Sequence, residues 1–182
     1  MILQVLQKFL ENLNLKIVLI IAAILVGIFF FFSWLLVLSL VIASIIVSFV
    51  VGKSHIRNIG LELVAFTAII TGFIYGATAG IAVGLILIVF HLAVAGFFGV
   101  YVIWTIPEYG LMGYLAATLA ASHSITFIGL SLVIGINVVN MIITASLFRG
   151  HSAKHLPWVF TNILFNAILF IFLAPNLVQI LH

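Results

Sequence analysis

Apolar residues run along this chain in long uninterrupted blocks, with short polar segments between them. The blocks cover residues 16–51, 59–100, 111–148 and 156–181. Continuous runs of this length are typical of membrane-spanning helices, whereas the strands of a membrane β-barrel alternate apolar and polar side chains. The pattern therefore predicts an all-α fold, a polytopic transmembrane helix bundle over residues 16–182.

The first block is too long for one ordinary span. As a single helix, residues 16–51 would be about 54 Å long, whereas the hydrocarbon core of a bilayer is roughly 30 Å thick. We therefore expect a helical hairpin that turns near Ser33 and Trp34. One long tilted helix is the alternative.

Each of the next two blocks is long enough for two helices. Residues 59–100 are expected to break at residues 76–78, and residues 111–148 at residues 122–124. The last block is one span, whose final turns Pro175 should disturb because proline removes a backbone N–H. The bundle therefore has about seven helices, or six if the first block is a single helix.

Residues 1–15 have a different pattern, with apolar and polar side chains recurring at helical spacing. Ile2, Val5, Phe9 and Leu13 are apolar, and Gln, Lys, Glu and Asn occupy much of the rest. The segment is either an amphipathic helix lying in the membrane interface or a frayed terminus. We expect the interfacial helix.

Composition supports a lipid environment. Only 5% of the residues are charged and 66% are hydrophobic, whereas a soluble domain has about 25% charged residues. All Lys and Arg residues flank apolar blocks, at Lys8, Lys16, Lys53, Arg57, Arg149 and Lys154. With seven spans they fall on one side, so the positive-inside rule predicts cytoplasmic loops at residues 53–57 and 149–154. The N-terminus would then lie inside and the C-terminus outside, and the cell membrane is the expected location.

Several kinds of chemistry lack their residues here. The chain has no cysteine, no aspartate, no phosphate-binding glycine loop, no metal-ligand spacing of histidines, and no basic patch that would bind nucleic acid. Glu62, His91 and Glu108 are the only plausible acid–base groups, and their spacing does not bring them together. We therefore expect no catalytic residues, metal or cofactor, and a protein that is not an enzyme.

Amides and aromatic residues are the candidates for a binding site. Two asparagine pairs have helical spacing, so each shares one helix face, and buried amides need partners. They either join the last helices or line a polar cavity. Residues 101–110 are expected to be a loop or re-entrant segment, acting as an interfacial aromatic belt or as a lid. The candidate solute-binding residues are Asn137, Asn140, Asn162, Asn166, His91, Tyr101, Trp104 and Glu108.

Two further features have alternative interpretations. Glu62 near the start of the second block is either an intramembrane functional acid or an interfacial partner of Arg57. Four glycines recur every four residues, which favours close helix packing in lipid or, alternatively, a docking face. They are Gly72, Gly76, Gly80 and Gly84.

Three glycine- and asparagine-containing stretches carry a family resemblance. Residues 71–84 (TGFIYGATAGIAVG), residues 110–117 (GLMGYLAA) and residues 162–166 (NILFN) resemble the S components of energy-coupling-factor (ECF) transporters, over roughly residues 59–181. The chain has Ala77 where such proteins commonly have a junction proline. The rod-shape-determining protein D family is the second resemblance, although its typical acid in the glycine-rich stretch is missing.

The resemblance implies a function. S components are small substrate-capture subunits with about six helices, and they depend on separate coupling and ATPase subunits. By this resemblance the chain is an integral membrane transport subunit that binds a small solute and has no ATPase of its own. The alternative is a non-catalytic scaffold or assembly subunit that holds other membrane proteins.

Overall fold

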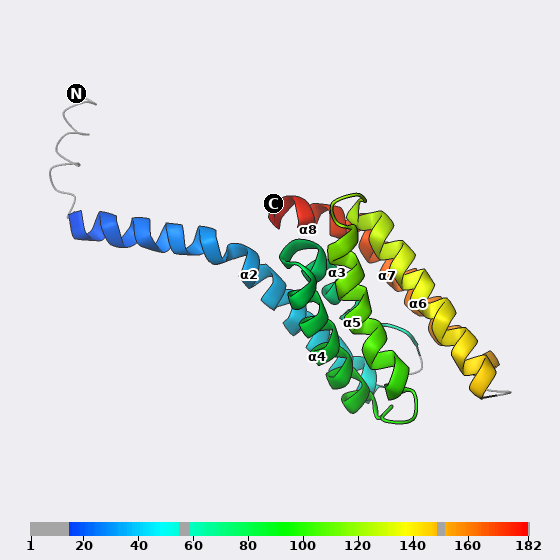
Figure 1. The fold of residues 1–182 in the computed structure, drawn as a ribbon. Helices are drawn as coiled ribbons and strands as arrows, with labels where there is room; N and C mark the ends of the chain where they lie inside the picture. Colours follow the sequence, from blue (N-terminus) through cyan, green and yellow to red (C-terminus); the bar gives the residue numbers. More distant parts are fainter. Residues whose placement is uncertain (1–14, 55–58, 149–151, 182) are drawn as a thin grey trace. The chain divides into compact units, whose positions relative to one another are not determined.

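The computed structural model describes residues 15–54, 59–148 and 152–181, and its regular elements over these residues are all helices (Figure 1). The predicted all-α fold is confirmed. The predicted interfacial helix at residues 1–15 lies outside the described residues, apart from Leu15. The chain divides into two compact units, residues 1–36 and residues 37–182.

Helix α2 (Leu15–Lys53) is continuous through Ser33 and Trp34, so the predicted hairpin is wrong. The apolar stretch between Gly27 and Gly52 has no glycine or proline, so nothing in the backbone favours a turn there. A single helix in place of two also removes one membrane crossing from the seven-span count on which the positive-inside prediction rests. The orientation of the basic loops therefore stays a prediction.

Helices α3 (Val64–Tyr75) and α4 (Ala77–Ala95) meet at Gly76, which confirms the predicted break at residues 76–78. Gly76 has a φ of 87°, a backbone conformation that side chains disfavour. Helix α4 ends at Gly96 in the left-handed conformation.

Helix α5 (Val102–Leu119) begins where a loop or re-entrant segment was expected at residues 101–110, so that prediction is wrong. Pro107 lies inside this helix. Proline near a helix start removes few intrahelical hydrogen bonds, so it does not require a loop. The connection between α4 and α5 is made by residues 96–101 instead.

Glycines let α3, α4 and α5 approach backbone to backbone. A Cβ atom on Gly72 would lie 2.1 Å from the carbonyl oxygen of Gly113, and one on Gly113 would lie 2.2 Å from the carbonyl carbon of Gly80. A Cβ on Gly84 would lie 2.4 Å from the carbonyl oxygen of Tyr109. Close contacts of this kind stabilise helices in lipid through packing.

Helix α6 (Ile125–Leu147) starts after the predicted break at residues 122–124, which is confirmed. Ser124 caps it by accepting a hydrogen bond from the backbone N–H of Phe127, with an N–O distance of 3.3 Å. Helix α7 (Ser152–Ile168) packs beside α6 (Figure 1).

A π-helical turn (Leu169–Leu173) joins α7 to α8 (Ala174–Leu181), so the helix does change just before Pro175. In this turn the N–H of Ala174 bonds to the carbonyl oxygen of Leu169, five residues back. Pro175 has no N–H to offer the carbonyl of Phe170 in the same way. The hydroxyl of Thr126 donates to that carbonyl instead, at 2.9 Å.

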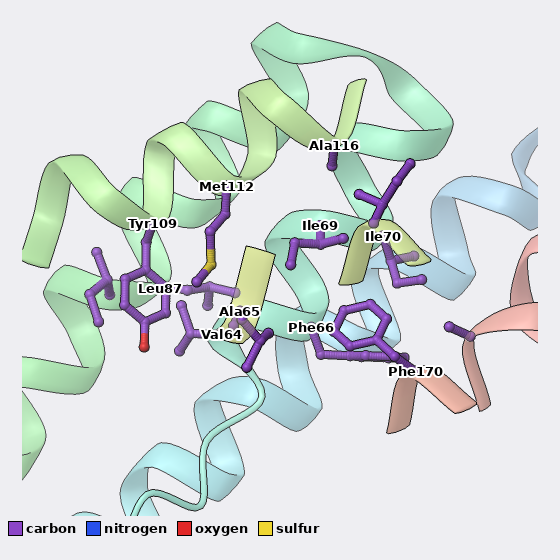
Figure 2. Packing of buried hydrophobic residues seen from close by; sticks show 14 of the residues in the cluster. Val64, Ala65, Phe66, Ile69, Ile70, Leu87, Tyr109, Met112, Ala116 and Phe170 are labelled. Atoms are coloured by element: carbon purple, nitrogen blue, oxygen red, sulfur yellow. The ribbon is translucent and has the colours of Figure 1, made fainter. Parts of the chain in front are cut away.

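Apolar side chains from α3, α4, α5, α6 and the π turn form the core of the second unit (Figure 2). The Phe66 and Phe170 rings lie 5.0 Å apart between centroids and join α3 to the π turn. On α6 the buried side chains include Asn137, Asn140 and Thr144, and the exposed ones include Ile134 and Ile142. A polar face turned inward and an apolar face turned outward suit a helix whose surroundings are lipid.

Four stretches of the described chain are long and apolar enough to cross a bilayer. They are Phe31–Lys53, Ala77–Ala95, Ile125–Leu147 and His155–Leu181. Val64–Tyr75 is a shorter apolar helix. These helices fit a membrane-embedded protein.

Candidate solute pocket

In the second unit, α4 and α6 end and α5 and α7 begin at the same end of the bundle (Figure 1). Residues from these helix ends line a pocket of about 220 Å³. Four helices and the connection between α4 and α5 surround it. Its lining consists of Ile88, His91, Leu92, Phe97, Tyr101, Thr105, Tyr109, Asn140, Thr144, His155 and Trp158. Three predicted site residues, His91, Tyr101 and Asn140, are therefore among the lining residues.

Asn140 connects the pocket to two other predicted residues. The indole Nε1–H of Trp104 donates to Asn140 Oδ1 at 2.8 Å, and Asn140 Nδ2 donates to Glu108 Oε2 at 2.7 Å. Glu108 is 8% exposed, and its Oε1 has no hydrogen-bond partner in the described part of the chain. Buried polar atoms nearly always have partners. The carboxylate next to Asn140 therefore has one unsatisfied oxygen.

Trp104 also belongs to an aromatic cluster with Tyr101 and Phe148. The Tyr101 ring lies 5.6 Å from that of Trp104 and 5.5 Å from that of Phe148, measured between centroids. The edge-to-face arrangement of Tyr101 and Trp104 is a favoured geometry for aromatic pairs. The cluster fixes the first turn of α5 against the end of α6.

Glu62 lies just before the start of α3. Its Oε2 accepts from the backbone N–H groups of Val64 and Ala65, and its Oε1 accepts from Tyr109 Oη and Asn162 Nδ2, both at 3.2 Å. Glu62 is 1% exposed. A carboxylate at a helix N-terminus with four donors is well satisfied. The predicted alternative partner, Arg57, lies outside the described residues.

Of the other three predicted asparagines, Asn137 and Asn162 bond to other elements, whereas Asn166 bonds within its own helix. Asn137 Nδ2 donates to Asn162 Oδ1 at 2.8 Å, which joins α6 to α7. Asn162 Nδ2 donates to the carbonyl oxygen of Gly60 at 3.0 Å, and Asn166 Nδ2 donates to the carbonyl oxygen of Asn162 at 3.1 Å. None of these three residues lines the pocket. The geometry of Asn137 and Asn162 corresponds to the helix-joining alternative, whereas Asn166 joins no second element.

His91 is buried on α4, and its Nδ1 lies 3.0 Å from Ser48 Oγ of α2. One turn before Ser48, Ser44 Oγ lies 2.6 Å from Thr67 Oγ1 of α3. These contacts hold the C-terminal part of α2 against α3 and α4. Among the described residues, His91, Glu62 and Glu108 make no hydrogen bond to one another.

Six polar or aromatic lining residues were missed from the sequence, and one of them is Phe97 in the connection between α4 and α5. Tyr109 and Thr105 were missed because residues 101–110 were taken as a loop, although they follow Tyr101 at intervals of four residues. Thr144 continues the helical face of Asn137 and Asn140, which was the available signal. His155 and Trp158 lie at the start of α7, and their rings stack with centroids 5.2 Å apart.

No family model matches the chain, and neither a curated protein nor a solved structure is similar to it. The long apolar helices fit a membrane-embedded protein. The pocket and the side chains around it are therefore the basis for a proposal of function.

Proposed function

We propose that the protein is an integral membrane subunit that binds a small, partly polar solute in this pocket, for transport across the cell membrane. The observation that carries the proposal is the pocket itself. It is bounded by four helices and has a mainly apolar and aromatic wall with a few polar groups, among them His91, Asn140 and Thr144. Binding sites for small molecules commonly have this composition.

The size of the pocket favours a small solute. A volume of about 220 Å³ lies below the roughly 300–1,000 Å³ of common ligand pockets. The lining combines apolar side chains with hydroxyl, amide, imidazole and indole groups, so it can contact both the apolar and the polar parts of such a solute.

The proposed role needs other proteins to supply energy. The chain has no nucleotide-binding loop, so coupling and ATPase subunits would be separate chains, as the resemblance to ECF S components implies. Among the described residues, Glu62, Glu108 and His91 each bond to other residues and not to one another. This arrangement supports a role in binding rather than in catalysis.

The scaffold alternative has less support. It relied on the glycine series as a docking face, but Gly72, Gly80 and Gly84 are buried against Gly113 and Tyr109 of the same chain. The fourth glycine, Gly76, forms the turn between α3 and α4. The glycines thus serve packing within the second unit, and solute binding is the function that the pocket favours.

Thr144→Leu is expected to abolish retention of a small molecule on the gently purified protein, because the larger apolar side chain would narrow the pocket and remove one of its polar groups. Thr144 is 3% exposed and lines the pocket. Native mass spectrometry of the protein taken directly from its own membranes measures the retained mass. The matched control is Thr118→Leu, at an exposed position of α5 outside the pocket.

The proposal requires a molecule of defined mass on the unchanged protein and on Thr118→Leu, and its loss from Thr144→Leu. A protein that retains no small molecule, or retains one equally well in both variants, would exclude the pocket as a solute site. A retained protein partner without any small molecule would instead support the scaffold.

A further inference from the structure

We infer that the solute of this pocket is a small organic cation, with a protonated amine or a quaternary ammonium group. The inference rests on the proposed function and adds the chemical class of the solute. Three observations lead to it. A buried carboxyl group is bonded to a lining residue of the pocket, that bonding partner is a neutral amide, and aromatic side chains line the same pocket.

The carboxylate is that of Glu108, which is separated from the pocket by residues that line it. Its only hydrogen-bond partner among the described residues is Asn140, and its chain neighbour Tyr109 also lines the pocket. Thr105, three residues earlier on α5, is a third lining residue. The carboxyl group of Glu108 is therefore next to lining residues of both α5 and α6.

Neutral groups alone bond to the two buried acids of the described chain. Glu108 accepts from an amide, and Glu62 accepts from backbone N–H groups, the Tyr109 hydroxyl and the Asn162 amide. Since Tyr109 bonds to Glu62 and follows Glu108, both carboxylates are close to one pocket residue. In a medium of low dielectric constant, an ionised carboxylate close to the pocket favours a cation over a neutral molecule.

The unsatisfied oxygen of Glu108 strengthens the argument. A buried carboxylate with one oxygen lacking any partner is unfavourable unless a cation or a proton compensates it. An ammonium group in the adjacent pocket would supply the compensating charge. With a neutral or anionic solute, a proton on Glu108 would have to provide that compensation.

Aromatic rings form much of the remaining wall. Phe97, Tyr101, Tyr109 and Trp158 all line the pocket. The negative faces of aromatic rings attract alkylammonium groups, and tryptophan does so most strongly. A wall of aromatic rings with a carboxylate next to it is therefore suited to a cation that carries apolar substituents.

The test compares three probes of nearly the same shape and different charge, namely choline, 3,3-dimethylbutan-1-ol and 3,3-dimethylbutanoate. Binding to the full chain in a non-ionic detergent is measured by titration calorimetry at about pH 8, where an ordinary imidazole is neutral. We expect choline to bind about tenfold more tightly than the alcohol, and the carboxylate to bind most weakly.

Glu108→Gln separates charge from shape, because glutamine retains an oxygen that can accept from Asn140. This variant is expected to lower the affinity for choline about tenfold and to leave the affinity for the alcohol unchanged. Thr118→Leu should change neither affinity. Circular dichroism and the unfolding midpoint of Glu108→Gln show that the fold is retained.

Each outcome decides between the two proposals. Equal binding of choline and the alcohol, or unchanged choline binding by Glu108→Gln, overturns the cation inference and leaves the solute pocket in place. The cation inference is also overturned, and the solute pocket stays in place, if the molecule retained from native membranes is neutral or anionic and Thr144→Leu abolishes its retention. If no probe binds and no retained molecule depends on Thr144, both proposals are wrong.

Discussion

Gly72→Ala is expected to destabilise the folded protein by about 3 kcal/mol, because the new methyl group has no room between α3 and α5. Its carbon would lie 2.1 Å from the carbonyl oxygen of Gly113, a backbone atom that cannot rotate away. The two helices would have to move apart, which would also weaken the contact between Gly80 and Gly113. Reversible unfolding in mixed micelles with increasing dodecyl sulfate measures the change.

Gly135→Ala is the matched control, since no atom lies within 4 Å of the Cβ that it would add. Alanine is a better helix former than glycine, so this variant should be as stable as the original protein or up to about 1 kcal/mol more stable. Similar stabilities for Gly72→Ala and Gly135→Ala would show that α3, α4 and α5 do not depend on close backbone contact.

Glu62→Gln is expected to lower the free energy of unfolding by about 3 kcal/mol, although the two side chains have nearly the same shape. Both carboxylate oxygens of Glu62 accept from two donors each. Glutamine replaces one oxygen with an NH₂ group, so at least one donor then faces another donor whichever way the amide is turned, even if the Tyr109 hydroxyl turns to accept. The same unfolding titration measures the loss.

Glu108→Gln provides the contrast within the same protein. Glu108 accepts one hydrogen bond, from Asn140, and its second oxygen has no partner among the described residues. Glutamine keeps one acceptor for Asn140 and brings its NH₂ group to the other position, so we expect a change of less than about 1 kcal/mol. Equal losses for the two variants would contradict the different roles assigned to the two acids.

The helical class and several helix boundaries were predictable because they depend on local chemistry. Gly76 provides the positive φ of one turn, and Ser124 caps the helix after another. The hairpin in residues 16–51 was wrong because it came from a length argument, whereas the residues near Ser33 offer no turn signal. A helix can exceed the thickness of a bilayer, so length alone does not require a turn.

The site was only partly predictable, because it depends on which helix faces meet. Asn140 and Thr144 share a helical face with Asn137, yet Asn137 bonds to Asn162 whereas the first two line the pocket. Spacing identifies the face but not the element that lies opposite. Glu62 was correctly noted as unusual, but its four donors come from segments up to 100 residues away along the chain.

The π turn at Leu169–Leu173 fixes the rotational phase of the last helix relative to the one before it. An α-helix advances about 100° per residue, and a π turn accommodates one residue more than an α-helical turn does. The stretch thus contains one residue beyond what a straight helix from α7 would need. With that residue, Phe170 packs over Gly129 and Ala174 is fully buried. A single-residue deletion here would therefore rotate every side chain of α8 about the helix axis, so the number of residues in this turn matters as much as their identity.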